Sequence, residues 1–297
     1  MVGFALLLLA AQDFAGSKSC AVCHSEIARS QSATHHAQAL GRTRDGRWAF
    51  GAGAQAVTYV SQSGEDAYLE HGLSWYKKSG GLALTPGHTA KEGVTYRTFA
   101  PDASILRCFQ CHSTGSLSLT SARAIEPAEP GVRCETCHGP GAEHAAKPSP
   151  ANIRNPSKLA AAEINDLCGQ CHRMPPARGA ATNFENPWNV RHQPVYFSQS
   201  ACFLKSEGKL SCLSCHNPHA DTKPAASAKP TADAKCAECH AKPKHVADVS
   251  NNRCVECHMP VVNPSPLLGF ANHWIGVYRL TGPRANLLRP VEQRPRR

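Results

Sequence analysis

Apolar and polar residues alternate over only one long part of this chain. Between Trp48 and Phe99, short apolar runs such as AVTYV, AYLEH and LSWYKK are separated by Gly, Ser and Asp residues. This pattern is typical of antiparallel strands joined by turns and predicts a small β insertion at about residues 45–100. Elsewhere we expect short helices, such as one over Ser157–Cys171, and much irregular backbone, because the chain has 22 glycines and 22 prolines.

The start of the chain has a different pattern. An apolar run from Phe4 to Ala11 is followed by small and polar residues. A run of this length suits the core of a signal peptide, which predicts a leader over residues 1–16 with cleavage between Ala11 and Ser17. An apolar N-terminal strand or helix is the alternative. Spanning a bilayer takes about 20 apolar residues, and we expect no transmembrane segment. The sequence therefore predicts an exported bacterial protein, located in the periplasm or otherwise outside the cytoplasm.

The pattern C-x-x-C-H occurs seven times and uses fourteen of the fifteen cysteines. In chain order, the motifs are Cys20, Cys23 and His24; Cys108, Cys111 and His112; Cys134, Cys137 and His138; Cys168, Cys171 and His172; Cys212, Cys215 and His216; Cys236, Cys239 and His240; and Cys254, Cys257 and His258. Two cysteines at this spacing bind the two vinyl groups of one porphyrin as thioethers, and the histidine binds the iron. Disulfides and zinc sites are alternatives, but neither requires a histidine after every second cysteine. We expect seven c-type haems.

Nine histidines lie outside the motifs, enough to supply a second axial ligand to every iron. The candidates in small or polar settings near motifs are His36 (or its neighbour His35), His144, His219, His245 and His273, followed by His192 and His88. His71 has the setting of an ordinary histidine, and Met174 and Met259 follow proximal histidines too closely to reach the opposite face of the same haem. Two histidine ligands leave no open position on the iron and suit electron transfer.

The formal net charge of +10 would ordinarily suggest an anionic partner. Seven haems would add about 14 negative charges as propionates, so the basic residues are better explained as their counter-ions. The sequence has no alternation of basic and aromatic residues typical of a single-strand binding groove, and we expect no nucleic-acid partner. The expected partners are redox proteins, such as other cytochromes, a reductase or a dehydrogenase. Association with a membrane-bound complex stays open.

The spacing of the motifs divides the chain unevenly. Residues 17–219 carry five motifs and the β insertion, and residues 236–278 carry two. The Ala, Pro, Lys and Thr composition of residues 220–235 predicts a flexible linker between these parts. Residues 279–297 are basic and poor in apolar side chains, which predicts a solvated tail. The remaining cysteine, Cys202, is expected to be a buried structural thiol.

Several stretches resemble a known family over most of the chain: SATHHA, RCFQCHSTGS, GVRCETCHGPGAEH, NPSKL followed by LCGQCH, SQSACFLKSEGKLSCLSCHNPH, RCVECHMP and NHWIG. They are similar to the multihaem family of the tetrahaem cytochrome of ammonia oxidisers, which is related to hydroxylamine oxidoreductase. The resemblance implies a mostly α scaffold with much irregular structure, packed around closely spaced haems. It also implies distal roles for His144 and His219, and for His36 and His273. Seven motifs match neither the tetrahaem nor the octahaem pattern, so no catalytic site is carried over.

These observations favour an exported heptahaem cytochrome that passes electrons between redox partners through low-potential haems. The alternative is a multihaem oxidoreductase acting on a small nitrogen or sulfur compound at one five-coordinate haem. No C-x-x-C-K motif is present, and no tyrosine spacing indicates a cross-linked haem. The sequence therefore favours an electron carrier over an enzyme.

Overall fold

The structure, a computed structural model, describes residues 13–88, 94–97, 103–175, 182–220, 231–240, 253–282 and 286–291. The helices are α1 (Ser17–Cys23), α2 (Ser25–Ser32), α3 (Ser104–His112), α4 (Cys134–His138), α5 (Ala142–Ala146), α6 (Ala161–His172), α7 (Gln193–Phe197), α8 (Ala201–Lys205), α9 (Thr231–Ala237) and α10 (Cys254–His258), with 3₁₀ turns η1 (Pro156–Lys158), η2 (Pro187–Arg191) and η3 (Cys212–Ser214). The strands are β1 (Leu40–Arg42), β2 (Trp48–Phe50), β3 (Ala56–Gln62), β4 (Ala67–Glu70), β5 (Leu73–Tyr76), β6 (Gly81–Leu84), β7 (Val94–Arg97), β8 (Ser113–Leu119), β9 (Ile125–Pro130), β10 (Val261–Ser265) and β11 (Leu268–Ala271).

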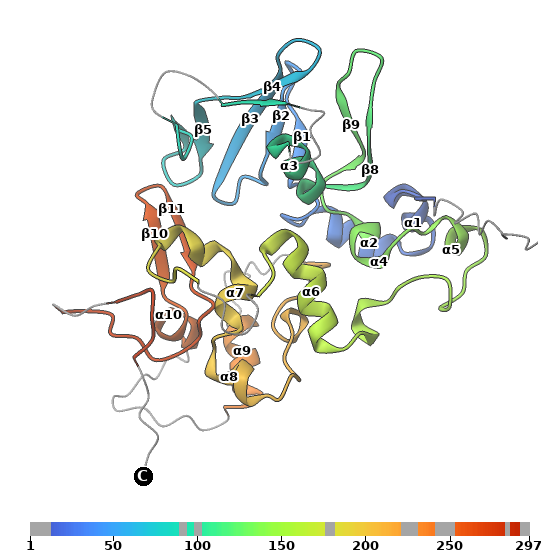
Figure 1. Cartoon of the computed structure of the whole chain (residues 1–297). Helices are drawn as coiled ribbons and strands as arrows, with labels where there is room; N and C mark the ends of the chain where they lie inside the picture. Colours follow the sequence, from blue (N-terminus) through green and yellow to red (C-terminus); the bar gives the residue numbers. More distant parts are fainter. Residues whose placement is uncertain are drawn as a thin grey trace, which may run out of the picture.

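Strands β1 to β7 form one antiparallel sheet, shown in blue to teal at the top of Figure 1. The order is β1-β2-β3-β4-β7, and the hairpin β5-β6 pairs with the first residues of β3. Because side chains alternate across a strand, the apolar positions lie on one face. Trp48 pairs with Val60 in the register of β2 and β3, and both side chains are buried. This face supplies one wall of an apolar core.

Helix α3 supplies the opposite wall of this core. Phe109, fully buried, lies with its ring centroid 5.1 Å from those of Trp48 and Phe50 and 6.0 Å from that of Tyr68. The Tyr68 hydroxyl accepts the backbone N–H of Ile125 at 2.6 Å, which joins the sheet to the hairpin β8-β9. Phe109 is the residue after Cys108, so the second motif is built into this core.

Several helices in the lower and right-hand parts of Figure 1 bury few or no side chains. Helices α1, α5 and α10 have no buried residue, and α4 buries only Glu135. A second apolar cluster lies near the C-terminal end, built from Val190, Val195, Tyr196 and Val262 with the half-buried Phe184, Phe270, Trp274, Leu287 and Leu288. Short helices without an apolar face of their own need another group to pack against.

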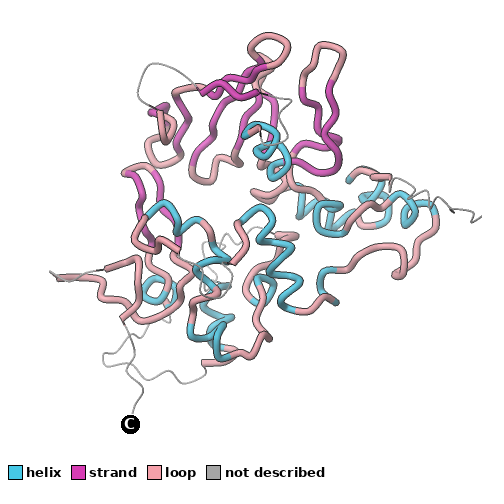
Figure 2. The backbone as a smooth tube through the Cα atoms, viewed as in Figure 1, coloured by secondary structure: helices cyan, strands magenta, loops and turns pink. Residues whose placement is uncertain are grey.

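Two aspects of the fold differ from the sequence-based expectation. Helices account for 33% and strands for 21% of the structure, so the fold is mixed and not mostly α, as Figure 2 shows in cyan and magenta. The antiparallel arrangement of the insertion is confirmed, but its sheet starts earlier, at Leu40. Two further hairpins, β8-β9 and β10-β11, were not expected. Both follow closely after a motif histidine, where no apolar alternation is long enough to reveal them.

The expected linker and tail also differ from what the structure shows. Helix α9 begins at Thr231, inside the stretch predicted to be a linker. The prediction of a solvated tail is wrong for residues 286–291. Leu287 and Leu288 pack on the second apolar cluster, and their carbonyls accept hydrogen bonds from the buried Asn272 side chain at 2.8 and 3.1 Å. The Arg289 guanidinium pairs with Glu185 at 2.5 Å. Two adjacent leucines were a signal for this docking that the basic composition obscured.

Candidate haem-binding sites

Most of the C-x-x-C-H motifs are helical over all or part of their length. The motifs in α3, α4, α6 and α10 end each helix on the motif histidine. Residues three and four apart lie on the same face of a helix, so the first cysteine, the second cysteine and the histidine all project to one side. In α6, the Glu163 carboxylate accepts the N–H of Ala160 at 2.7 Å and fixes the start of the helix. Local structure alone thus aligns two thioether positions with one axial ligand.

Four motif histidines face a histidine from outside the motifs. The imidazole centroids are 6.4 Å apart for His24 and His144, 6.0 Å for His138 and His219, 6.2 Å for His216 and His273, and 6.0 Å for His172 and His36. The first three pairs have near-parallel rings, with interplanar angles of 15°, 13° and 28°, and the fourth is nearly perpendicular at 80°. Each outside histidine belongs to a segment distant in sequence or attached to a different motif.

These separations fit one iron between each pair of rings. Metal–imidazole bonds of about 2 Å on opposite sides of an iron, extended by about 1 Å to each ring centroid, give a centroid separation of about 6 Å. Direct stacking of two imidazoles would bring the rings closer. Within the described parts of the chain, no group of three or more His, Cys, Asp or Glu side chains is arranged to hold a metal ion. Two axial nitrogens are the donor set that a haem iron needs from a protein.

The second ring nitrogen of several of these histidines is held by a backbone carbonyl. The Nδ1–H of His112 donates to the carbonyl of Ala39 at 2.9 Å, and that of His138 donates to the carbonyl of Arg154 at 2.9 Å. The Nδ1–H of His258 donates to the carbonyl of Gly276 at 2.8 Å. Nδ1 of His144 lies 3.0 Å from the carbonyl of Ser149, and Nδ1 of His273 lies 3.0 Å from that of Ala271. A carbonyl only accepts, so Nδ1 carries the proton and Nε2 is left with its lone pair for a metal.

Burial also keeps several of these imidazoles in the form that binds iron. It lowers the pKa of His112, His138 and His216 below the usual histidine value, and it lowers the pKa of His273 to about 4. Desolvation disfavours the charged imidazolium, and these rings are neutral at pH 7. Only neutral imidazole is a metal ligand.

Backbone features outside the motifs position the outer histidines, and the sequence did not reveal them. Gly131 has φ 84° and approaches the carbonyl of Ala37 so closely that a Cβ would lie 2.0 Å from it. The next residue, Val132, donates its N–H to the carbonyl of His36 at 2.8 Å. The fully buried Ser200 hydroxyl donates to the carbonyl of His273 at 2.7 Å. A residue without a side chain is therefore needed at position 131, where the chain passes close to the loop that contains His36.

The second motif is different. The ring that contacts His112 is that of Phe50, at a centroid distance of 5.4 Å and an angle of 72°. Within the described part of the chain, no imidazole faces His112 as one faces each of the four paired histidines. The apolar core below the sheet therefore reaches the ring of His112.

Two other predicted candidates, His88 and His192, are placed elsewhere. His88 binds the Glu70 carboxylate through Nε2 at 2.8 Å and its side chain is buried. The Nδ1 atom of His192 lies 3.4 Å from Nη1 of Arg173, and burial, with a contribution from Arg173, lowers its pKa. His245 lies outside the described residues. His71, expected to be an ordinary histidine, is hydrogen-bonded to the Ser61 hydroxyl at 2.7 Å through Nε2.

Cysteines of different motifs lie in contact, which shows how the motifs are ordered in space. As free thiols, Cys111 of the second motif and Cys171 of the fourth are hydrogen-bonded, which lowers the pKa of Cys111 to about 7 and raises that of Cys171. Cys168 and Cys212 are hydrogen-bonded likewise, which joins the fourth motif to the fifth. Burial raises the pKa of Cys20 to about 11, with further contributions from Cys134 and Glu135.

The backbone shows the same neighbours. Helix α1 of the first motif packs against α4 of the third, α6 against η3, and α9 against α10. Burial raises the pKa of Cys137, and the Cys168 thiolate adds to the shift, which places the third motif beside the fourth. Burial also raises the pKa of Cys215, with smaller contributions from Cys202 and Cys239. The order in space is therefore first, third, fourth, fifth, sixth and seventh motif, with the second beside the fourth.

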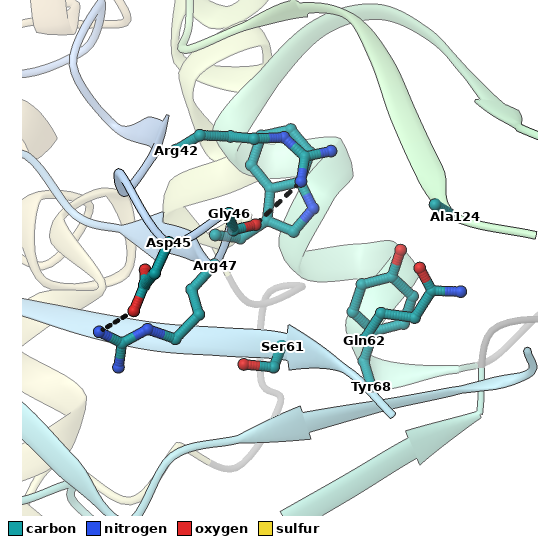
Figure 3. Close-up of a pocket in the computed structure, with 9 residues that line it drawn as sticks. Arg42, Asp45, Gly46, Arg47, Ser61, Gln62, Tyr68 and Ala124 are labelled. Atoms are coloured by element: carbon teal, nitrogen blue, oxygen red, sulfur yellow. Dashed lines mark hydrogen bonds and ion pairs between the residues drawn. The ribbon is translucent and has the colours of Figure 1, made fainter. Parts of the chain in front are cut away.

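A surface cleft of about 240 Å³ lies on the sheet and carries no motif residue. Figure 3 shows its two arginines, and both are already paired. Arg42 binds Glu126 at 2.5 Å and lies 3.8 Å above the Trp48 ring, whereas Arg47 binds Asp45 at 2.8 Å. With both charges compensated, this cleft is a structural feature of the sheet.

No helix in the described part of the chain has both the length and the apolar character to cross a membrane.

Comparison with known proteins gives matches of one kind. The family model "Doubled CXXCH motif" matches residues 206–245, and "Cytochrome c554 and c-prime" matches residues 74–139. Multiheme cytochrome MtrA of Shewanella baltica (strain OS185) is 25% identical over 170 residues, which are 52% of this chain and 45% of that protein. The chain thus spans about half the length of this relative.

Two solved structures are similar in fold. The undecaheme cytochrome from the S-layer of Carboxydothermus ferrireducens has a TM-score of 0.55 and 18% identity, with 90% of this chain and 52% of that chain covered. The outer cell wall cytochrome OcwA has a TM-score of 0.53 and 18% identity, with 88% of this chain and 79% of that chain covered. At this identity the likeness concerns the fold alone, and it includes nearly the whole chain.

Proposed function

We propose that this chain, a multihaem c-type cytochrome, holds seven covalent haems and transfers electrons between redox partner proteins outside the cytoplasm. A c-type haem with two histidine ligands exchanges one electron between ferric and ferrous iron and offers no open position to a substrate. The observation that carries the proposal is the set of four imidazole pairs with centroid separations of 6.0 to 6.4 Å.

The pairs support an assignment of the axial ligands residue by residue. His24 with His144, His138 with His219, His172 with His36, and His216 with His273 would hold the first, third, fourth and fifth haems. The assignment for the fourth haem favours His36 over its neighbour His35. For the sixth and seventh motifs, His240 and His258 supply the proximal ligands, and His245 remains a candidate second ligand. Histidine ligation without methionine supports low reduction potentials.

The order of the motifs supports a continuous route for electrons. Contacts between cysteines of neighbouring motifs bring the attachment edges of successive haems together, from the first motif through the third and fourth to the fifth. The contacts around Cys215 and between Cys236 and Cys254 continue the series to the seventh. The route therefore joins the two parts of the chain on either side of residues 220–230.

Three observations support a location outside the cytoplasm. Covalent attachment at C-x-x-C-H, the apolar run at residues 4–11 and two fold relatives that are named as S-layer and outer cell wall cytochromes all support export. The match to MtrA and to the c554 model supports redox proteins as partners. The kinship with the tetrahaem cytochrome of ammonia oxidisers and with hydroxylamine oxidoreductase belongs to the same proposal.

Replacement of one outer histidine tests the ligand assignment. In the purified holoprotein, His144→Ala should convert one of the seven haems from low-spin to high-spin in the electron paramagnetic resonance spectrum, because His24 then has no opposing imidazole. His71→Ala is the matched control, since His71 is hydrogen-bonded to Ser61 within the sheet, and it should change nothing. Pyridine haemochrome and intact mass count the haems. A haem content other than seven, or a His144→Ala spectrum equal to wild type, contradicts the proposal.

A second function is favoured by the environment of His112. With Phe50 against the His112 ring and no imidazole facing it among the described residues, the second motif would hold a haem with an open axial position, where a small nitrogen or sulfur compound could be oxidised or reduced. The wild-type protein should then show one high-spin haem equivalent that shifts on addition of nitrite or hydroxylamine. The His144→Ala signal calibrates the amplitude of one equivalent. A wild-type spectrum that is entirely low-spin and unaffected by these compounds excludes this second function.

A further inference from the structure

Glu135 occupies the position after the first cysteine of the third motif and is the one buried side chain of α4. Its relative exposure is 4%, which is unusual for a carboxylate because burying a charge is costly unless hydrogen bonds compensate it. Three backbone N–H groups donate to it: Ala15 to Oε1 at 2.8 Å, Gly16 to Oε2 at 2.8 Å and Gly141 to Oε1 at 2.6 Å. Among the described residues, three donors and no acceptor surround the Glu135 oxygens, which fits an ionised carboxylate, because a protonated acid would itself donate a hydrogen bond.

The three donor residues lie immediately before the first turns of two different helices. Gly16 precedes α1, which carries Cys20 and Cys23 and is capped at its C-terminal end by His24, and Gly141 precedes α5, which carries His144. His24 and His144 are the facing pair with an interplanar angle of 15°. One carboxylate therefore fixes the starting points of both helices that supply the axial imidazoles of the first haem. Glu135 itself belongs to the motif of a different haem.

The surroundings allow little freedom at this point. Gly16 has φ 77°, in the left-handed region, and a Cβ at Gly141 would lie 3.2 Å from Oε1 of Glu135. The N–H of Ala142 donates to the carbonyl of Asp13 at 3.1 Å, and the hydroxyl of Ser17 donates to Glu129 at 2.9 Å. These bonds tie the start of α1 to α5 and to β9. Because α1 and α5 bury no side chain, hydrogen bonds position them where apolar packing is absent.

The charge of Glu135 also acts on the first motif. Burial raises the pKa of the Cys20 thiol, and after Cys134 the Glu135 carboxylate makes the next contribution. A fixed negative charge in a region of low dielectric constant favours the ferric iron over the ferrous iron nearby. Its removal should therefore make the first haem easier to reduce.

We propose that Glu135 is the positioning residue of the first haem: it aligns His24 with His144 across the iron, and its negative charge lowers the reduction potential of that haem. This inference rests on the ligand assignment under the proposed function.

The first test replaces Glu135 by glutamine in the full-length holoprotein. Glutamine keeps one acceptor oxygen, so at least one of the three N–H groups loses its partner, and the charge is lost. In a spectroelectrochemical titration, the ratio of reduced to oxidised first haem at a fixed potential should rise at least tenfold, equivalent to about 59 mV for one electron. The resonance signal that disappears in His144→Ala identifies the first haem. Its g values should change in Glu135→Gln, because they depend on how the axial ligands are oriented.

The matched control is Glu256→Gln. Glu256 also lies inside a C-x-x-C-H motif, but it is exposed and pairs with Arg253, so the same loss of charge should leave the first haem unchanged. Glu135→Asp separates the two parts of the proposal. It keeps the charge and shortens the side chain, so it should alter the g values of the first haem while its ratio of reduced to oxidised haem changes by less than tenfold.

The outcomes separate cleanly. If Glu135→Gln lowers the unfolding midpoint or speeds amide exchange at Gly16 and Gly141, yet leaves the g values and potential of the first haem unchanged, the residue is only structural and the inference is overturned. Unaltered g values in Glu135→Asp overturn the positioning part. If His144→Ala itself changes no signal, the ligand assignment fails, and that failure is recognised independently of Glu135.

Discussion

The second and third motifs hold their histidines by opposite means, and the difference begins at one position. After the first cysteine, the second motif has Phe109 and the third has Glu135. Phe109 is inserted among the aromatic side chains of the sheet, whereas Glu135 accepts three backbone hydrogen bonds. Both side chains are buried. One motif is thus fixed by an apolar core of the protein and the other by backbone hydrogen bonds.

The surroundings of the two motifs differ in the same way. Beneath the sheet, protein side chains fill the interior up to His112, whose ring contacts Phe50. Around the third motif, α1 and α5 bury no side chain and His138 faces an imidazole. In the described part of the chain, the motif built into the apolar core beneath the sheet has no imidazole facing its histidine, whereas the third motif, which lacks such a core, has one. We expect a bound haem to supply the missing apolar surface around the third motif.

Haem deprivation should separate the two regions most strongly. When the full chain is produced without haem attachment, α1, α4, α5 and α6 should lose their amide protection, because their packing partner is missing. The sheet formed by β1 to β7 should retain amide protection, because its apolar core, which includes Leu40 and Ile125, consists of protein side chains. Hydrogen exchange with mass spectrometry, compared between haem-free and holo chains, measures this. Equal loss of protection in both regions would show that the sheet also depends on haem.

Truncation of Phe109 should be the most destabilising of the single changes. Phe109→Ala removes a fully buried ring that contacts Trp48, Phe50 and Tyr68, and should cost about 3–5 kcal/mol in the free energy of unfolding. Val255→Ala, at the same position of the seventh motif and only half-buried, should cost about 1 kcal/mol or less. Denaturant unfolding followed by circular dichroism gives both values. Equal costs would mean that the sheet core does not anchor the second motif.

The two regions also differ in how far the sequence predicts them. The β insertion was predicted because a sheet with its own core requires apolar alternation, as in AVTYV and LSWYKK. The motifs could be located in the sequence from the C-x-x-C-H spacing alone. Among the outer histidines, the facing positions of His36, His144, His219 and His273 agree with the candidates selected from their settings, although their role as ligands remains a proposal.

The sequence could not show what tertiary contacts decide. His88 and His192 were candidates ranked below the others, and the sequence did not indicate that Glu70 and Arg173 are their partners in the fold. Glu135 resembled an ordinary polar residue between two cysteines, and two of its three donors lie 119 and 120 residues away in sequence. The absence of an imidazole partner for His112 within the described residues follows from the position of Phe50 on β2. No local pattern contains that information.

The smallest expected effect concerns the hydrogen bonds beside His273, at the edge of the second apolar cluster. Asn272 is fully buried beside His273, and its side chain donates to the carbonyls of Leu287 and Leu288. Asn272→Ala leaves these acceptors and the N–H of Trp274 without partners, which should cost about 1–3 kcal/mol in the free energy of unfolding.

The same change should weaken ligation by His273, because the segment that carries this histidine loses its tie to the C-terminal residues. Asn286→Ala provides the comparison. The exposed Asn286 side chain accepts the N–H groups of Leu288 and Arg289 within the C-terminal residues, and its loss should cost about 0.5 kcal/mol. Urea unfolding and the low-spin signal of the fifth haem measure the two effects. A low-spin signal that is unchanged in Asn272→Ala would mean that the pairing of His216 with His273 is maintained by the haem itself, and that the hydrogen bonds follow ligation instead of positioning it.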